Sequence, residues 1–497
     1  MPQILNLPRN LGNLPNLRDF TLNELPELRT LPESIGNLSS LRSFTLHELA
    51  ELNSLPECIG NLSNLRSFTL SELPELGALP ESIGDLTNLS SFTLYNLPKI
   101  YTLPESLGNF GNLANLQKLH ADFSHLERFP ESLNLSRLES LDMAHDIVHC
   151  QLPDSALLPA LKEVDTTSPN LSMFPPAVLQ SANVRDLTLK LESQDPRADF
   201  SESLRHWNDL THLCIYTDVD DTLYFSQTLA TACPKLEELS LSSHEGSIVM
   251  KMDELGSLQY LKKLEVESCK ISSNAIEGTM SSRMEWPSME HLLLHDVDMD
   301  PLLLINLHVP NMKSVVLGHG ERLNTATFEH LVSEWFPHVK TLKQLDVSHS
   351  MIEDVSLSAI SVLSKTGLVE LNLTENPILE GYEDDIERML LPIIEGCPSI
   401  LEFDGELLGS PVMREVEAIA LAVSLNRARK HILGGQRVAK SLWPTILSKA
   451  DKAFVYKNES GNKLRSHLKK QDEVYTLLRK RAAFDLFNER GERSLMS

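Results

Sequence analysis

The chain has 497 residues, which is longer than one compact core supports, so several domains or one elongated repeat array is expected. Its hydrophobic content of 41% and charged content of 23% are ordinary for a folded protein, while aromatic residues are sparse at 6%. The formal net charge is −25, and such acidity opposes nucleic-acid binding, because that binding depends on phosphate neutralisation by Lys and Arg.

Residues 1–110 repeat one phrase of 24 residues. Leu31–Ser54 reads LPESIGNLSSLRSFTLHELAELNS, and the next 24 residues read LPECIGNLSNLRSFTLSELPELGA. A fixed period of this length predicts stacked supersecondary units, none of which buries its apolar face alone. The phenylalanines of successive copies stand in register, at Phe20, Phe44, Phe68 and Phe92.

Each unit divides into two parts with different patterns. The stretch RDFTLN alternates exposed and apolar residues, which predicts a short strand with one buried face. The stretch LPESIGN places Pro where a helical or extended turn begins, and Gly-Asn where the chain reverses. We therefore expect one strand, one corner and one irregular or 3₁₀ return arm per unit, with the strands stacked into a curved parallel sheet.

These residues resemble the leucine-rich repeat, and LPESIGNL is similar to the plant disease-resistance and intracellular Ras-group types. The resemblance implies an α/β solenoid whose parallel sheet lines the concave face, with irregular, 3₁₀ and then helical segments on the convex side. Most such repeats place Asn or Cys after the strand, where this chain has Leu25, Leu49, Leu73 and Leu97. Leucine buries more carbon there and removes a hydrogen-bond ladder between repeats.

Residues 111–410 continue with longer and less regular repeats. The L-x-x-L-x-L frame or a near variant recurs at Leu116–Ala121, Leu138–Met143, Leu161–Thr166, Val184–Leu189, Leu210–Ile215, Leu236–Leu241, Leu261–Val266, Met289–Leu294, Met312–Leu317, Leu342–Val347, Leu368–Leu373 and Ile400–Gly405. About sixteen repeats result in total. The phrases CPKLEELSLSS and GLVELNLTENPIL resemble the longer ribonuclease-inhibitor-like repeats, in which Asn376 supplies the ladder residue.

Two features of this middle region concern its return arms. The longer spacing leaves room for true helices, and VSLSAISVLSKTG predicts one. Residues 190–206 and 270–287 are expected to be loop insertions.

Residues 411–497 are predicted to form a basic helical cap or tail. From 412 to 497 there are 18 Lys and Arg against 9 Asp and Glu, a net charge of +9, while residues 1–411 carry −34. The stretch VMREVEAIALAVSLNRARKHIL places apolar residues on one helical face, which would close the last repeat. This tail is similar to the helical ends of diatom leucine-rich repeat proteins. The first repeat has no polar cap, so a segment preceding Met1 is expected.

Signatures of enzymes and cofactor sites are missing from the sequence. It holds no phosphate loop, dinucleotide-binding, serine-hydrolase or kinase motif, so we expect no enzyme activity and no cofactor. His291 and His295 have the spacing of helical zinc ligands, but on a predicted strand they lie about 13 Å apart, so no metal site is expected. Six scattered cysteines, no signal peptide and no long apolar run predict a cytoplasmic protein without a membrane span.

The remaining candidate for a functional site is the expected concave surface, which could bind a partner. Strand positions between the buried leucines form columns on the expected concave face, and variable or charged residues on and beside these columns are the candidate binding residues. They are Arg18, Asp19, Asn23, Arg42, His47, Arg66, Ser71, Tyr95, Glu238, Glu265, Glu267, His291 and His295.

The predicted function is therefore a non-enzymatic interaction scaffold or recognition module, of the kind used in signal transduction. It would act as a monomer and bind a protein partner, not nucleic acid, on the concave face. One alternative stays open: a ligand-sensing fragment of a larger immune-receptor-like or ubiquitin-ligase substrate-receptor protein, with its N-terminal module preceding Met1.

Overall fold

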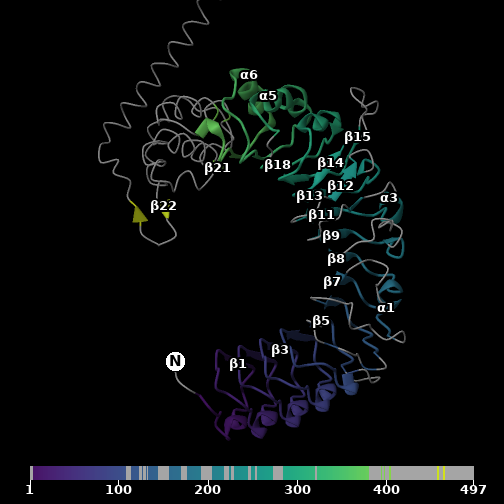
Figure 1. The fold of residues 1–497 in the computed structure, drawn as a ribbon, viewed down its shortest axis with the longest axis vertical. Helices are drawn as coiled ribbons and strands as arrows, with labels where there is room; N and C mark the ends of the chain where they lie inside the picture. The colour runs from purple at the N-terminus through teal and green to yellow at the C-terminus, as the bar shows by residue number, and fades with distance from the viewer. Residues whose placement is uncertain are drawn as a thin grey trace, which may run out of the picture.

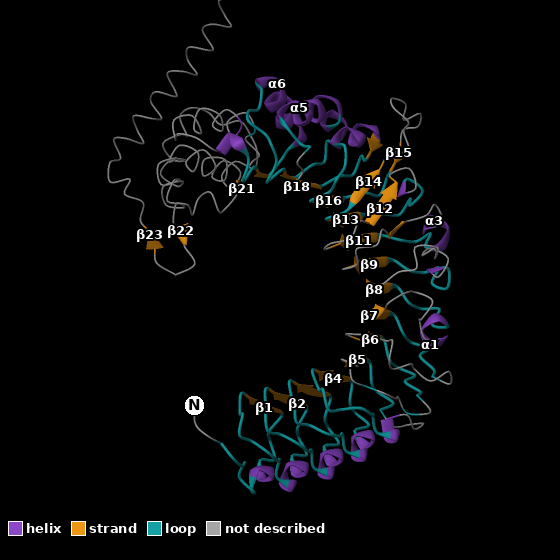
Figure 2. Ribbon diagram, viewed as in Figure 1, coloured by secondary structure: helices purple, strands orange, loops and turns teal. Residues whose placement is uncertain are grey.

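The computed structural model of the chain is a curved array, in which strands line the inner side of an arc and helices lie on its outer side (Figures 1 and 2). The structure describes residues 4–107, 113–121, 126, 130, 133–143, 156–168, 176–191, 204–217, 223–224, 229–243, 248–251, 255–272, 284–319, 322–379, 393, 397, 402–403, 456–457 and 463–464.

The inner side of the arc is one 16-stranded sheet, whose strands follow each other in chain order. The regular repeats supply β1 (Asp19–Asn23), β2 (Ser43–His47), β3 (Ser67–Ser71) and β4 (Ser91–Tyr95). The longer repeats supply β5 (Lys118–Ala121), β6 (Ser140–Met143), β7 (Glu163–Ser168), β8 (Asp186–Leu191), β9 (His212–Thr217), β11 (Glu238–Ser243), β13 (Lys263–Glu267), β16 (His291–His295), β18 (Ser314–Gly318), β19 (Gln344–Asp346), β20 (Glu370–Asn372) and β21 (Glu402–Phe403).

All neighbouring strands of this sheet pair in parallel, and every L-x-x-L-x-L frame found in the sequence carries one of them. The expected leucine-rich-repeat solenoid, with its curved parallel sheet and about sixteen repeats, is confirmed.

The return arms of the regular repeats are short 3₁₀ helices, as predicted. They are η1 (Leu11–Asn13), η2 (Glu33–Asn37), η3 (Glu57–Asn61), η4 (Glu81–Asp85) and η5 (Glu105–Leu107). Pro32 precedes η2 in an extended conformation, with φ −73° and ψ 143°, which suits the fixed φ of proline. Ile35 and Ile59 of these arms are fully buried, so each arm turns one apolar side chain toward the sheet.

A column of stacked phenylalanine rings forms the centre of the N-terminal core. The ring centroids lie 5.6 Å apart between Phe20 and Phe44, 5.4 Å between Phe44 and Phe68, and 5.7 Å between Phe68 and Phe92, with nearly parallel planes. Such stacked pairs contribute about 0.5–1.5 kcal/mol each beyond their buried area. The identical position of Phe in each copy therefore fixes the register of the sheet.

The strands end at a sharp corner, where the next residue adopts a left-handed backbone. Glu24, Glu48, Glu72 and Asn96 have φ between 50° and 55°. This turn lets the N–H of Glu48 donate to the carbonyl of Ser71 at 3.2 Å, and that of Glu72 to Tyr95 at 3.0 Å. The same corner recurs in later repeats, at Ser268, Asp296, His319, His349 and Glu375. A non-glycine residue in this region costs about 1–3 kcal/mol, so surrounding packing must enforce the corner.

The residue after the corner behaves as the sequence predicted. Leu49 and Leu73 are fully buried, so carbon packing replaces the usual polar ladder there. Asn376 restores the ladder in the last repeats: its side-chain amide donates to the carbonyl of Val347 at 2.7 Å and accepts from the N–H of Ile352 at 3.0 Å. Asn376 is itself fully buried, so its bonds to two neighbouring segments satisfy the buried amide.

The outer side of the longer repeats carries helices and small sheets (Figure 2). The helices are α1 (Pro176–Leu179), α3 (Leu229–Ala232), α5 (Thr325–Glu334) and α6 (Leu357–Thr366), joined by 3₁₀ segments η7 (Pro301–Asn306), η8 (Phe336–His338) and η9 (Pro377–Leu379). The helix predicted from VSLSAISVLSKTG is confirmed as α6. Ser356 caps its start by accepting from the N–H of Ala359, and Gly367 ends it with φ 77°.

Small parallel sheets replace parts of the predicted loops. One contains β10 (Leu223–Tyr224), β12 (Ile248–Lys251) and β14 (Lys270–Ser272), and another contains β15 (Met284–Glu285) and β17 (Leu307–His308). The expectation that 270–287 is a loop insertion is therefore wrong at both ends, because the outer chain segments also pair from repeat to repeat. The expected insertion at 190–206 is wrong at its start, where Lys190 and Leu191 end β8. Residues 192–203 and 273–283, the middles of the two expected insertions, lie outside the described residues.

The number of residues between paired strand positions changes where the repeat sequence becomes less regular. Paired positions are 24 residues apart from β1 to β4, 27 apart from Ser91 to Lys118, and between 22 and 32 apart thereafter. The predicted cap at 411–497 lies outside the described residues, apart from the antiparallel pair β22 (Tyr456–Lys457) and β23 (Lys463–Leu464). In the part of the chain that the structure describes, no helix has the length and apolarity needed to cross a bilayer.

A close approach between repeats explains the glycine of the repeated phrase. A Cβ atom on Gly36 would lie 2.4 Å from the carbonyl oxygen of Cys58 in the next repeat, whereas a Cβ atom on Gly77 would meet nothing within 4 Å. We expect Gly36→Ala to lower the free energy of unfolding by about 1–3 kcal/mol through overpacking, and Gly77→Ala to be neutral or slightly stabilising. Urea unfolding of both variants measures this, and equal effects would contradict the close approach.

Candidate partner-binding face

Three columns of outward side chains run along the inner face of the arc. They come from the first, third and fifth residues of each strand and are called here the first, middle and third columns. In β1 to β4 the first column is Asp19, Ser43, Ser67 and Ser91, the middle column is Thr21, Thr45, Thr69 and Thr93, and the third column is Asn23, His47, Ser71 and Tyr95. The alternating burial of these strands confirms that the columns face away from the core.

The predicted arginines lie beside the first column. Arg18, Arg42 and Arg66 directly precede β1, β2 and β3, and their side chains are exposed. The main-chain carbonyl of Arg18 accepts hydrogen bonds from the N–H groups of Arg42 at 2.6 Å and Ser43 at 3.0 Å. The backbone at these positions therefore holds the repeats together, while the exposed guanidinium groups stand beside the face.

The remaining predicted residues form a second group on β11, β13 and β16. Glu238 and His291 lie in the first column, Glu265 in the middle column, and Glu267 and His295 in the third column. Glu265 already accepts a charged hydrogen bond from Lys263 at 2.8 Å, and Glu267 accepts one from the hydroxyl of Ser242 at 3.1 Å. The two predicted groups share one face but are separated by β5 to β9.

The sequence analysis missed the residues that join them. His120, Asp142 and Asp165 are successive members of the middle column, on β5, β6 and β7. Asp186 and His212 follow in the first column, and Tyr216 lies in the third. The signal was present, because each stands at the expected outward position of a recognised L-x-x-L-x-L frame.

These residues make the middle of the face acidic. We call the outward positions of β5, β6, β7, β8, β9, β11 and β13 the central face. It carries seven acidic side chains and three lysines, a net charge of −4 with histidines neutral: Glu163, Asp186, Glu238, Asp142, Asp165, Glu265 and Glu267 against Lys118, Lys190 and Lys263. The corresponding positions of β1 to β4 carry one charged residue, Asp19.

Several of the central carboxylates contact a histidine or lysine side chain. His120 Nδ1 is hydrogen-bonded to Asp142, and His212 contacts Asp186 at 2.5 Å and Glu238 at 3.6 Å. Asp165 has no such neighbour on its β8 side, where Thr188 is its register partner. Partial loss of water around its carboxyl, followed by repulsion from Asp142 and opposed by His120, raises the pKa of Asp165 to about 6, although the residue as a whole is exposed.

Exposed aromatic side chains flank these carboxylates. Tyr95 is 39% exposed and Tyr216 is 45% exposed, both in the third column. The ring of Tyr95 lies 6.2 Å from that of His120. A hydrogen bond with Cys214, with nearby carboxylates, raises the pKa of Tyr216 to about 12, so its hydroxyl remains a donor at neutral pH. Exposed tyrosines beside charged groups are typical of surfaces that bind proteins.

One set of side chains in the described residues could hold a metal ion. The ligand atoms of His47, Glu48 and Glu72 all lie within 4.8 Å of one another. His47 Nε2 contacts a carboxylate oxygen of Glu48 at 3.1 Å, and both side chains are substantially exposed. The pair His291 and His295, by contrast, occupies opposite ends of β16.

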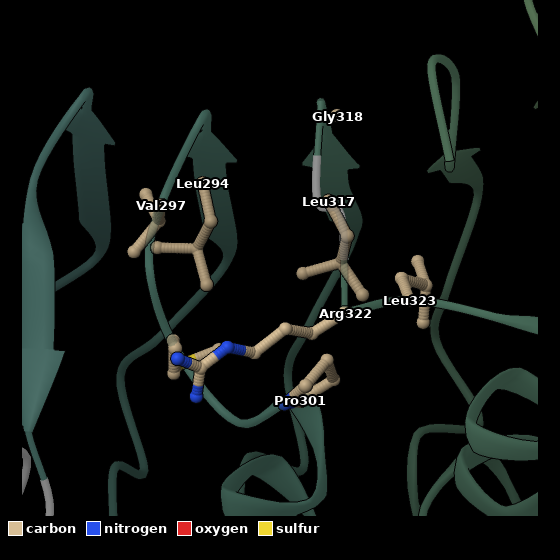
Figure 3. Close-up of a pocket in the computed structure, with 8 residues that line it drawn as sticks. Leu294, Val297, Pro301, Leu317, Gly318, Arg322 and Leu323 are labelled. Carbon is tan, nitrogen blue, oxygen red and sulfur yellow. The ribbon is translucent and has the colours of Figure 1, made fainter. Parts of the chain in front are cut away.

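A small pocket opens at the ends of β16 and β18 (Figure 3). Leu294, Leu317 and Pro301 line it, and Arg322 reaches across it to an ion pair with Asp298 at 2.6 Å. Its volume of about 30 Å³ accommodates water molecules but not a metabolite.

Three of the described cysteines are not activated nucleophiles. Cys58, Cys214, Cys233, Cys269 and Cys397 form no disulfide. Burial raises the pKa of Cys233 to about 12 and that of Cys397 to about 11, and partial burial raises that of Cys58 to about 11. These three side chains therefore stay protonated at neutral pH, and a protonated thiol is a poor nucleophile.

Part of the chain matches a known family of repeats. Residues 6–216 match a family described as leucine-rich repeat region. A search of the curated proteins finds no similar sequence.

Three of the solved structures that resemble the chain are distant from it in sequence. A leucine-rich repeat protein of Leptospira interrogans is 21% identical, covering 81% of this chain and 93% of that chain, with a TM-score of 0.44. The plant peptide hormone receptor RGFR1, solved with RGF2, is 19% identical, covering 80% and 64%, with a TM-score of 0.38. TLR13, solved with ssRNA13, is 17% identical, covering 81% and 68%, with a TM-score of 0.40.

The raised pKa of Asp165 makes a stability prediction. Its pKa is higher in the folded state than the ordinary value of 3.8, so ionisation of the carboxyl opposes folding as pH rises from about 4 to about 6. Asp165→Asn should raise the free energy of unfolding at pH 7.5 by about 1 kcal/mol, allowing for solvent screening, and by less at pH 4. Thermal melting at both pH values measures the difference.

Glu163→Gln is the control, because it removes the same charge one column away on the same strand. An equal pH-dependent gain in that variant would show that net charge, and not the surroundings of Asp165, is responsible.

Proposed function

We propose that this chain is a non-enzymatic recognition module. Its residues 6–216 match a leucine-rich repeat region, and its fold is a leucine-rich repeat solenoid. It binds a protein partner on the concave face, through the three outward columns of the sheet. Its proposed place of action is the cytoplasm, as a scaffold or receptor in a signalling pathway.

The observation that supports this proposal best is the continuous outward face of the 16-stranded sheet. From β1 to β16 the paired outward positions hold mostly half-buried and exposed polar side chains, and among them Tyr95 is 39% and Tyr216 is 45% exposed. A broad face with aromatic anchors in a polar surround has the composition of protein interfaces.

The features of the face favour a protein over the other partner classes. The acidic central face repels a phosphate backbone. A broad, open face suits recognition of a protein better than catalysis, which needs reacting groups gathered in an enclosed site.

A pulldown tests the proposal with substitutions on the face. We expect Tyr95→Ala combined with Glu265→Lys and Glu267→Lys to reduce capture of partner proteins from the native cell at least tenfold, because an anchor is lost and two charges are reversed. The control combines Tyr260→Ala with Glu334→Lys and Glu353→Lys, all exposed and outside the three columns.

The control should capture the same proteins as the unmodified chain, identified by mass spectrometry. Unchanged capture by the column variant, with circular dichroism showing that it is folded, would overturn the concave face as the binding surface.

A further inference from the structure

We propose that the central face binds an extended segment of the partner that is rich in Lys and Arg, with one cationic side chain seated between Asp142 and Asp165. The inference rests on the proposed function, since it assumes that the concave face is the binding surface. It adds the chemistry of the bound segment and the residues that select it.

The geometry of the two aspartates suits a cation. Asp142 and Asp165 are register partners on the adjacent parallel strands β6 and β7, both in the middle column. Neighbouring strands lie about 4.8 Å apart, so an ammonium or guanidinium group placed between the two carboxylates can bond both at once. Arg is the better fit, because its planar fork presents several donors in fixed directions.

The surroundings of Asp165 leave its charge largely unbalanced. On its own strand stands Glu163, on β6 stands Asp142, on β5 stands His120 and on β9 stands Tyr216. From β8, Asp186 and Lys190 also face this region. The His120 ring is already hydrogen-bonded to Asp142, and Lys190 lies in the third column. A cation from a partner therefore supplies the positive charge that the middle column lacks.

A second acidic group sets the spacing of the bound segment. Glu265 and Glu267 lie on β13, four strands along the sheet from Asp165, which corresponds to about 19 Å. An extended chain covers this distance in about six residues. The segment should therefore carry two cationic residues about six positions apart, lying across the strands.

Binding of the cation should also displace a proton. The carboxyl of Asp165 has a pKa of about 6, so at pH 5 it is mostly protonated and neutral. A seated cation favours the ionised form, so binding releases the proton and affinity rises as pH increases from 5 to 7. Loss of one proton predicts about a tenfold change across that range.

A labelled peptide provides a direct test on the full chain. The probe is fluorescein-tagged GRGSGSGRG, whose arginines are six positions apart, and its partner probe replaces both Arg with Glu. Fluorescence anisotropy at pH 7.5 and low salt should show binding of the arginine peptide only. Asp142→Asn with Asp165→Asn should weaken that binding at least tenfold.

The matched control, Glu334→Gln with Glu353→Gln, removes the same net charge outside the three columns and should change the affinity less than twofold. Equal weakening in both variants would reduce the effect to overall charge and overturn the inference. So would an arginine peptide that fails to bind, or affinity in the unmodified chain that is independent of pH between 5 and 7.

One more variant tests whether the chain's own basic tail, and not a partner segment, occupies the central face. If Arg479→Gln, Lys480→Gln and Arg481→Gln together create binding that the unmodified chain lacks, the central face belongs to the tail and the partner segment is wrong. Capture of partners that still depends on Tyr95, Glu265 and Glu267 while the peptide fails would leave the proposed function standing and reject only this inference.

Discussion

Each repeat in this solenoid buries its apolar face only against the next repeat. Leu52, Ile59 and Phe68 have no exposed surface and belong to one core that runs through successive repeats, and Phe68 stacks on the rings of both neighbouring repeats. The hydrophobic effect therefore acts along the array, and it is satisfied only when neighbouring strands share one register. The phenylalanine stack and the approach of Gly36 to Cys58 both depend on that register. The same register aligns the side chains of the concave columns, because side chains alternate between the two faces of every strand.

Most of the fold could be predicted from the pattern of leucines. Alternation identified all sixteen inner strands, LPESIG identified the return arms, and the phrase ending in Asn376 identified the restored ladder. The left-handed corner could not be predicted, since Glu is an uncommon choice there and only the packing of the whole repeat enforces it. The small outer sheets were also missed. Their strands are two to four residues long, and their pairing is decided by neighbours rather than by local pattern.

The candidate face was predictable in part. In the regular repeats a constant period places Asn23, His47, Ser71 and Tyr95 side by side without any knowledge of the structure. Beyond β4 the spacing varies, so the neighbours of His120 and Asp165 become clear only when the register is known. The charged neighbours of a carboxylate also become clear only when the register is known. Asp142 contacts His120, and Asp165 lies beside Asp142, although the members of each pair are more than twenty positions apart in sequence.

The changing length of the repeats has a consequence for how this surface can evolve. Paired positions are between 22 and 32 residues apart in the longer repeats, yet the strands still pair residue for residue. The return arm absorbs every added residue, whether as a 3₁₀ turn, a helix such as α6 or an outer strand such as β14. An insertion on the convex side therefore leaves the order of side chains on the concave side unchanged. The two sides of one chain can accumulate changes separately, so a new outer attachment could be gained without altering what the inner face recognises.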